Sequence, residues 1–393
     1  MLLKYLTTWQ ASIHMNSQVP LIQLLQDHTL TSKLTTKEWE LIIRQARAAD
    51  LLAHLFFLTK ENNSKGSIPR KALSHIESAY LISDKQRLTV HNEVFHLLQA
   101  FENSEIPLIL LKGAAYITAK LQASNGRLLS DIDILVPEEK IPTAEKLLTL
   151  NGWFGNHHDS YDERYYRQWM HEIPPLIHII RQSTLDVHHT ILPPTANCHP
   201  DPKKLFDHAK KIPNTNIFTL SPEDIAIHSA THLFHEGEFD HGLRDLVDLA
   251  TLFREFEEKD PLFWDNLIPR AIELDLTKPL YYGIRYTRII LNSDIPAKQE
   301  IYSKVAQPNR LALVLMDFLF CRALVPHHTS CNIAFTGFAR WALFIRSHYL
   351  RMPFYLLIPH LIRKAWKKRF SKPLDESQID AHQADDLRKE AGG

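Results

Sequence analysis

Cysteine is scarce in this sequence, which disfavours both a disulfide framework and a cysteine-based zinc site. Only three of the 393 residues are cysteines, Cys198, Cys321 and Cys331, and none belongs to a Cys-x-x-Cys pair. A disulfide framework needs several cysteines that can pair, and a zinc knuckle needs closely spaced Cys-x-x-Cys pairs. We therefore expect a protein of a reducing, cytoplasmic compartment.

Long apolar runs are also missing. The most apolar stretch, residues 311–325, is interrupted by Asp317 and Arg322, whereas a helix that crosses a bilayer needs about 20 apolar residues. The stretch is typical of a buried helix instead. The N-terminal residues show no long apolar core followed by a small-residue cleavage site, so we expect no signal peptide.

Neither sign of charge predominates. Lys and Arg together number 45, and so do Asp and Glu, so the chain has no general basic field of the kind that binds nucleic acid in bulk. The hydrophobic share of 45% is ordinary for a globular protein with a sizeable core. The length suits about two or three domains.

The predicted fold class is α+β, with a small mixed-sheet core flanked by N-terminal and C-terminal helical regions. Helical periodicity dominates before about residue 100 and again from Ser221 to about residue 350. Between these regions, short apolar runs bounded by Pro and Gly indicate strands. We therefore divide the chain into a helical region 1–103, a mixed-sheet core 104–192, a helical domain 193–339, a basic amphipathic segment 340–371 and a disordered tail 372–393.

The core is predicted to alternate strands with helices. A buried strand at 107–111 leads through a Lys112-Gly113 turn into a helix at 114–121, and a second strand follows at 130–136. The next helix begins near Pro142 and ends at Asn151-Gly152. A hairpin follows at 176–181 and 184–191. Residues 193–220 contain five prolines and indicate a linker with short elements.

The second strand carries the most informative motif, Asp131-Ile132-Asp133. Side chains alternate along a strand, so the two carboxylates face the same way. Neighbouring carboxylates repel each other unless a cation lies between them. Magnesium prefers such hard oxygen ligands and often bridges them to phosphates. The motif therefore predicts a metal site, and its alternative is a solvated strand face at a sheet edge.

Residues on either side of this motif are suited to phosphate and metal binding. A glycine at a strand-to-helix turn lets the backbone approach a phosphate, and the helix N-terminus offers unpaired N–H groups. Lys112 adds a cation there, unless it is an ordinary surface lysine. Asp186, in the second arm of the hairpin, is the candidate third ligand of a two-metal site, unless it is a polar residue of the hairpin surface. Arg127 can contact a phosphate or stabilise its turn.

These motifs, in this order, resemble the nucleotidyltransferase fold of the polymerase β superfamily, and more closely a family of uncharacterised bacterial nucleotidyltransferases. The resemblance covers about residues 20–255, and the matching segments are 110–115, 127–136, Gly152, 185–188, Ala226-x-His228-x-x-x-His232 and Leu243-Arg244-x-Leu246-x-Asp248. The superfamily usually has Gly-Ser or Gly-Gly where this chain has Lys112-Gly113, although the closer family accepts Lys-Gly. The serine that would contact the phosphate is absent.

The resemblance implies metal-dependent transfer of a nucleoside monophosphate from a nucleoside triphosphate (NTP) to a hydroxyl-type acceptor. The acceptor classes in view are a small molecule, a glycan-related group and a protein. Mg²⁺ or Mn²⁺ is the implied cofactor. Asp131 and Asp133 would bind both metals, and Asp186 would bind one of them and help to activate the acceptor. The implied nucleotide-binding residues are Lys112, Gly113, Ala114, Arg127 and Ser130.

A histidine-bearing helix follows the core. His228 and His232 are four residues apart and share a helix face, as do Arg244 and Asp248, which are spaced for an ion pair. With His188, these four residues are candidates for an acceptor pocket or for packing of the helical domain against the sheet. A metal hydrolase site made of His228, His232, His241 and Asp248 is the alternative, although Ser229 stands where a His-Glu-x-x-His motif needs its Glu.

The segment 340–371 interleaves basic residues with Trp, Phe and Tyr. Such a pattern suits a helix on an anionic membrane surface, and it allows peripheral contact at the inner membrane face. The alternative is a packed terminal helix with a solvated basic face.

The sequence supports three hypotheses. The first is a metal-dependent nucleotidyltransferase enzyme. The second is a catalytically weak or inactive module that binds a nucleotide or a partner through a degenerate version of the same site, with membrane association as a variant of this hypothesis. The third is the histidine-based hydrolase.

Overall fold

The computed structural model describes residues 19–61, 65–155, 166–167, 169–235, 237–296 and 307–353. The described residues up to Arg351 belong to one compact unit. The predicted tail 372–393 and residues 354–371 of the predicted basic segment lie outside the described residues. No helix among the described residues is long and apolar enough to cross a membrane.

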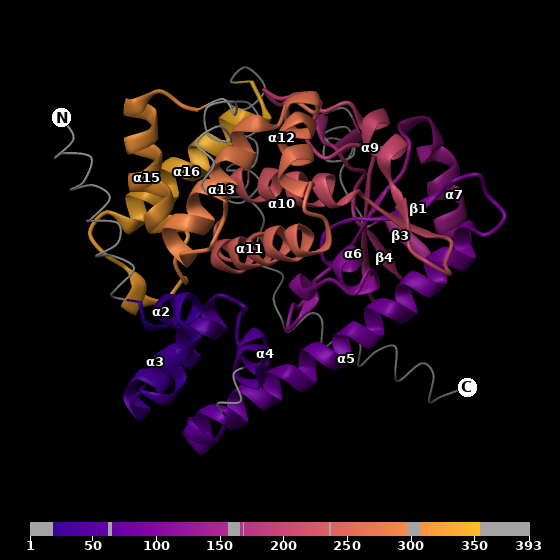
Figure 1. Cartoon of the computed structure of the whole chain (residues 1–393). Helices are drawn as coiled ribbons and strands as arrows, with labels where there is room; N and C mark the ends of the chain where they lie inside the picture. The colour runs from indigo at the N-terminus through magenta and orange to yellow at the C-terminus, as the bar shows by residue number, and fades with distance from the viewer. Residues whose placement is uncertain are drawn as a thin grey trace, which may run out of the picture. The chain divides into compact units, whose positions relative to one another are not determined.

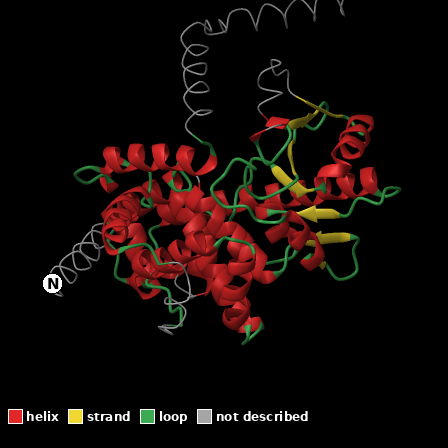
Figure 2. Cartoon of the chain, turned by 90° about the horizontal axis from the view of Figure 1, so that it is seen from above, coloured by secondary structure: helices red, strands yellow, loops and turns green. Residues whose placement is uncertain are grey.

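Within the described residues, seven strands form one mixed sheet in the order β3-β4-β5-β2-β1-β7-β6. Their bounds are β1 Leu108–Leu110, β2 Ile132–Leu135, β3 Trp153–Gly155, β4 Leu176–His178, β5 Thr184–His188, β6 Lys210–Lys211 and β7 Ile217–Thr219. β2 runs parallel to β5, and β1 runs parallel to β7, whereas the other neighbours are antiparallel. Figure 2 shows these strands gathered at one side of the helices. The predicted α+β class is confirmed.

The central strands are short apolar runs that are buried on both faces. All residues of β1 and all of β2 are buried, including Asp133. Strands that are covered on both faces consist of continuous apolar residues. Both strands could therefore be recognised in the sequence. Asp133 is the one charged residue of β2, and its burial requires compensating partners.

Helices account for most of the remaining described residues. Four precede the sheet: α2 Pro20–Gln26, α3 Thr36–Ala48, α4 His54–Glu61 and α5 Arg70–Phe101. α6 Lys112–Thr118, α7 Ile141–Leu150 and α9 Pro202–His208 lie between strands. The helices after the sheet are α10 Pro222–His235, α11 Gly242–Lys259, α12 Phe263–Glu273, α13 Thr277–Leu291, α15 Arg310–Ala323 and α16 Thr336–Arg351. In Figure 1 the long helix α5 runs from the N-terminal helices to the sheet, and it contacts α3, α4, α6 and α7.

Local capping explains several helix starts. Thr35 accepts a hydrogen bond from the Glu38 N–H while the Glu38 side chain accepts one from the Thr35 N–H, which is a capping box before α3. The predicted start of α10 is confirmed: the Ser221 hydroxyl accepts from the Asp224 N–H, and Pro222 is the first helical residue. Both caps satisfy N–H groups that the first helical turn leaves unpaired.

The structure departs from the predicted elements in three places. The sheet extends beyond the boundary placed at residue 192, because β6 and β7 come from the segment expected to be a linker. These strands have two and three residues, too few to show a strand period among prolines. α6 begins at Lys112 rather than after the turn. The strand predicted at 130–136 is shorter, Ile132–Leu135, so Asp131 lies just before it.

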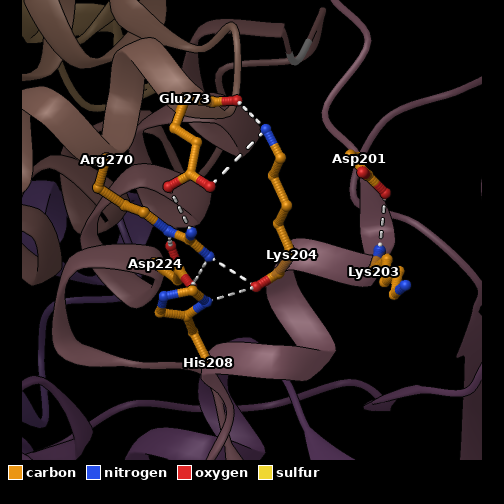
Figure 3. Close-up of polar contacts among 7 residues, drawn as sticks. All are labelled: Asp201, Lys203, Lys204, His208, Asp224, Arg270 and Glu273. Atoms are coloured by element: carbon orange, nitrogen blue, oxygen red, sulfur yellow. Dashed lines mark hydrogen bonds and ion pairs between the residues drawn. The ribbon is translucent and has the colours of Figure 1, made fainter.

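A buried ion pair joins α9, α10 and α12 (Figure 3). Arg270 donates to both carboxylate oxygens of Asp224, at 2.7 and 2.9 Å, and to the Lys204 carbonyl at 2.7 Å. Asp224 is fully buried and Arg270 is 7% exposed. The Arg270 guanidinium also donates to Glu273 at 2.8 Å. One side chain thereby links three helices around a carboxylate that has no access to water.

Replacing Arg270 tests this pair. Arg270→Met should lower the free energy of unfolding by about 3 kcal/mol, because it leaves the buried Asp224 carboxylate without a counter-charge. Adding Asp224→Asn should recover part of that loss, since the remaining group is then neutral. Urea unfolding would measure both effects. The matched control is Lys203→Met at an exposed position of α9, expected to change stability by less than about 0.5 kcal/mol. Equal losses in Arg270→Met and the control would contradict the assignment.

Candidate active site

The parallel pairing of β2 and β5 places two acidic residues side by side. Asp133 is the register partner of Asp186, and Leu135 is the partner of His188. Because side chains alternate along each strand, Asp133, Asp186 and His188 share one face of the sheet. Asp131 immediately precedes β2 and also acts electrostatically on Asp186. The structure therefore brings together the three carboxylates that the sequence singled out.

Asp133 is buried and is held by two partners. The Lys112 Nζ lies 2.8 Å from its Oδ1, and the His188 Nε2 lies 2.9 Å from the same oxygen. Burial by itself would raise the pKa of Asp133, but the Lys112 ammonium and the His188 hydrogen bond outweigh it and hold that pKa well below its usual range. Asp133 is therefore a permanent anion with a cation of the chain itself beside it.

Lys112 reaches Asp133 from the turn between β1 and α6. Its backbone is left-handed, with a φ of 43°, a conformation that costs about 1 kcal/mol or more for a residue other than glycine. Burial would lower the pKa of its ammonium, but the charge of Asp133 raises it above the usual value. The ammonium is thus aimed at the carboxylate site and stays charged.

Asp186 has no such compensation. Its Oδ1 is buried and has no hydrogen-bond partner among the described residues. Burial, followed by the charges of Glu172, Asp133 and Asp131, raises the pKa of Asp186 to about 7. Like-charged carboxylates at this spacing are unfavourable without a cation. Hard oxygen donors with one unsatisfied atom fit a divalent ion such as Mg²⁺.

His171 and Glu172 complete the cluster, although the sequence alone did not single them out. Glu172 pairs with His188 in an isolated antiparallel bridge, and its Oε2 lies 3.5 Å from the His188 Nε2 and 4.0 Å from the His171 Nε2. Potential ligand atoms of His171, Glu172 and His188 all lie within 4.8 Å of one another. The hairpin register alone does not predict this pairing: continued from Leu176 and Leu185, it would set Glu172 opposite His189, one residue away from its partner His188.

The α10 helix covers this cluster with histidine. His228 is buried, and burial, followed by the charges of Lys112, His232 and His188, holds its pKa well below the usual value. His228 is therefore neutral and lies close to Lys112. His232 is partly exposed on the same helix face. An acceptor-pocket role for His228 and His232 stays a prediction.

Gly113 lies in a closely packed position. A Cβ built on Gly113 would lie 2.6 Å from the Leu129 Cδ2 and 3.0 Å from the Arg127 Nε, so a larger residue would displace these side chains. Ala114, also predicted to bind nucleotide, is fully buried, whereas Ser130 is exposed. Nucleotide binding by Gly113, Ala114 and Ser130 stays a prediction.

Arg127 is bound by acidic residues of α11. It forms ion pairs with Asp248 and, at 3.6 Å, with Asp245, and its guanidinium lies 5.5 Å from the Tyr116 ring centre. Of its two predicted roles, stabilising the turn is the one that these contacts support. A nucleotide-binding role for Arg127 stays a prediction.

Arg244 and Asp248 do not pair as their helical spacing suggested. Arg244 pairs with Asp245 at 2.9 Å and with Asp50 at 3.7 Å, whereas Asp248 pairs with Arg127. Helical spacing cannot show such tertiary partners, which come from the N-terminal helices and the core loop.

The histidine-based hydrolase set is not assembled either. His241 contacts Asp50 at 2.8 Å, and Asp248 is paired with Arg127. In the described part of the chain, the group of three or more close metal-ligating residues is His171, Glu172 and His188. It lies on the sheet, next to Asp133.

Removing the Asp186 charge should stabilise the metal-free chain at alkaline pH. Because the folded-state pKa of Asp186 is raised to about 7, the folded chain binds more protons than the unfolded chain between about pH 4 and 7, so stability falls as pH rises through this window. With chelator present, the free energy of unfolding of Asp186→Asn should exceed that of wild type by about 2 kcal/mol at pH 8. At pH 4 the two free energies should be nearly equal. Urea unfolding across pH would measure this.

The control for this prediction is Asp207→Asn, at an exposed position on α9. It should stay within about 0.5 kcal/mol of wild type at each pH. A wild-type pH dependence that Asp186→Asn leaves unchanged would contradict the assignment.

The comparisons with known proteins identify a family for this chain. No curated protein and no solved structure gives a significant match. A family model described as uncharacterised nucleotidyltransferase matches residues 35–292, which is more than half of the chain and includes the sheet, α10 and α11. The chain belongs to this family of uncharacterised nucleotidyltransferases.

Proposed function

We propose that this nucleotidyltransferase uses Mg²⁺ or Mn²⁺ to move a nucleoside monophosphate from an NTP to a hydroxyl-type acceptor. The observation that carries the proposal is the opposition of Asp133 and Asp186 on parallel strands, with a buried Asp186 oxygen that no described residue satisfies. Membership of the family supports nucleotidyl transfer in general. The metal and the acceptor are part of the proposal.

The carboxylates would hold the metal. Asp131, Asp133 and Asp186 offer hard oxygen ligands on one side of the sheet, and magnesium is bound in proteins mainly by carboxylates and substrate phosphates. When bound there, the ion would neutralise charge on the triphosphate and lower the pKa of the acceptor hydroxyl. The mutual repulsion of the carboxylates would be relieved by the same binding event.

Other residues of the site have separate roles. Asp186, with its pKa near 7, is matched to accepting a proton from a hydroxyl at neutral pH. Lys112 supplies a positive charge at the entrance to α6, beside Asp133, where phosphate oxygens would be stabilised. His228 and His232 of α10 would line the acceptor side, and the acceptor class is a small molecule, a glycan-related group or a protein.

A second candidate function is a nucleotide-binding module with weak or no catalysis. It is favoured by one observation: the Lys112 ammonium already neutralises Asp133 at 2.8 Å. A metal at Asp133 must compete with this ion pair. If the pair persists with nucleotide bound, fewer carboxylate oxygens are free for a second metal, and the chemistry would be impaired.

Metal-dependent binding of nucleotide tests the first part of the proposal. In thermal unfolding with ATP, CTP, GTP or UTP, at least one nucleotide should stabilise the wild-type chain when Mg²⁺ is present and not with chelator. A nucleotide at about 100 times its Kd stabilises by about 2.7 kcal/mol. Asp131→Asn with Asp186→Asn should abolish the shift while circular dichroism stays unchanged. Asp133 is left intact, because its removal would leave Lys112 buried without a partner.

The control variant is again Asp207→Asn, which should keep the full shift. Absence of a metal-dependent shift with all four nucleotides in the wild type would count against the proposal. A shift without release of pyrophosphate from any NTP would favour the binding module.

A further inference from the structure

We infer that His171, Glu172 and His188 form a transition-metal site beside Asp133, next to the magnesium carboxylates. The inference rests on the proposed function, because it adds a second kind of metal to the same centre. Two imidazoles and one carboxylate are a donor set for Zn²⁺ or Co²⁺ rather than for Mg²⁺, since imidazole suits the later divalent metals and magnesium prefers oxygen.

The spacing of the donor atoms supports this site. The Glu172 Oε2 lies 3.5 Å from the His188 Nε2 and 4.0 Å from the His171 Nε2, and the Asp133 Oδ1 lies 2.9 Å from the same His188 nitrogen. Ligands about 2.0–2.2 Å from one tetrahedral zinc are about 3.3 Å from each other. The ligand atoms of His171, Glu172 and His188 all lie within 4.8 Å of one another, so movements of up to about 1.5 Å would bring the three around one ion.

The local backbone holds the donors in place. Glu172 and His188 are bridge partners, the Ile173 N–H donates to the Val187 carbonyl, and the His189 N–H donates to the His171 carbonyl. Asp133 is fixed to the same strand through the β2–β5 register. Ligands on paired strands keep their spacing better than ligands on a free loop.

Unsatisfied buried polar atoms gather at this place. They are the Asp186 Oδ1, the His171 Nδ1 and the His188 Nδ1, none of which has a hydrogen-bond partner among the described residues. His188 is 1% exposed. Buried polar atoms are nearly always paired, and a concentration of exceptions on one face indicates that an additional ligand belongs there.

A metal at this site would act on the nucleotide site through Asp133. The Asp133 Oδ1 accepts from both Lys112 and His188. An ion bound by His188, whose Nε2 lies 2.9 Å from the Asp133 Oδ1, would help to neutralise this carboxylate and weaken its attraction for Lys112. The Lys112 ammonium would then be available to a phosphate. The transition metal would thus control whether the Lys112 ammonium pairs with Asp133 or binds a phosphate.

Titration of the metal-stripped full chain with Co²⁺, followed by visible absorption, tests the site. One equivalent should give a d–d absorption band, and Zn²⁺ should displace it. His171→Gln and Glu172→Gln should each weaken binding at least about tenfold. His189→Gln is the matched control: it is adjacent in sequence, contacts the Met170 carbonyl and should bind Co²⁺ as wild type does.

The double variant Asp131→Asn with Asp186→Asn separates this inference from the proposed function. It should keep the Co²⁺ band while losing the Mg²⁺-dependent nucleotide shift. Co²⁺ binding that survives His171→Gln unchanged would overturn the inference, and so would Co²⁺ binding that is lost only in the double variant. A wild type that binds Co²⁺ but no nucleotide would overturn the proposed function alone.

A different observation concerns the exposed face of α15 and α16. These two helices pack against each other and carry exposed apolar residues: Leu311, Val314, Leu315, Phe338, Trp341, Ile345 and Tyr349. On α16 the spacing of residues 338, 341, 345 and 349 places them on one face. Trp341 is 61% exposed and Leu311 is 86% exposed.

The arginines of α16 point the other way. Arg346 donates to the Phe234 carbonyl at 2.8 Å, and Arg351 donates to the His235 carbonyl at 2.9 Å. Both carbonyls lie at the C-terminal end of α10, where cations are favoured. α16 is thus packed, with Ala339, Leu343 and Ser347 buried, while Arg346 and Arg351 bond to α10 and several apolar side chains face water.

We also propose that this face, formed by the exposed apolar residues of α15 and α16, docks on an anionic lipid surface. Aromatic and aliphatic side chains on one helix face are suited to the boundary between lipid headgroups and acyl chains. The sequence after α16 supplies a basic cluster, Arg363, Lys364, Lys367, Lys368 and Arg369, and each basic residue near an anionic leaflet contributes about 1 kcal/mol. Charge complementarity therefore selects an anionic membrane as the occupant.

Co-sedimentation of the full chain with phosphatidylcholine vesicles, with and without phosphatidylserine, tests this surface. Binding should require phosphatidylserine, and Trp341→Ser with Ile345→Ser should weaken it at least about tenfold. Ile82→Ser, at an exposed apolar position on α5, is the control and should bind normally. Binding that the double variant leaves unchanged would overturn the proposal. So would a wild-type dimer that the double variant converts to monomer, because a second copy would then cover the face.

Discussion

The parallel pairing of β2 with β5 is the constraint on which the site depends. Its register sets Asp133 beside Asp186 in a buried environment, where two carboxylates repel each other strongly. The two carboxylates are compensated differently. Asp133 pairs with Lys112 and His188, whereas the Oδ1 of Asp186 has no hydrogen-bond partner among the described residues. A site with one satisfied and one unsatisfied carboxylate is poised to gain from a cation.

The surrounding elements hold this arrangement through charged contacts between distant parts of the chain. Arg127 joins the loop before β2 to α11, and the Arg270–Asp224 pair joins α9 and α12 to α10. α10 in turn places neutral His228 close to Lys112. The predicted catalytic core and the predicted helical domain therefore share one compact unit, in which the helical part builds one side of the site.

Much of the fold could be predicted from local patterns. The apolar run before Lys112, the Asp-x-Asp strand, the hairpin around Gln182 and the cap at Ser221 are all present, because each depends on neighbouring residues. β6 and β7 could not be predicted, since strands of two and three residues show no period. The contacts of Arg127 with Asp248 and of Glu172 with His188 were equally invisible, because their partners lie 16 residues apart or more in sequence.

The sequence by itself determined the class of chemistry, because the order of a lysine-glycine turn, an Asp-x-Asp strand and an acidic hairpin strand is a linear property. It also determined which strands are buried, since burial follows apolar content. Only the tertiary structure decided how the charges are paired: Lys112 with Asp133, Arg127 with Asp248, and the α16 arginines with α10 carbonyls. Pairing depends on distances across strands and between helices, and those distances exist only once the chain has folded.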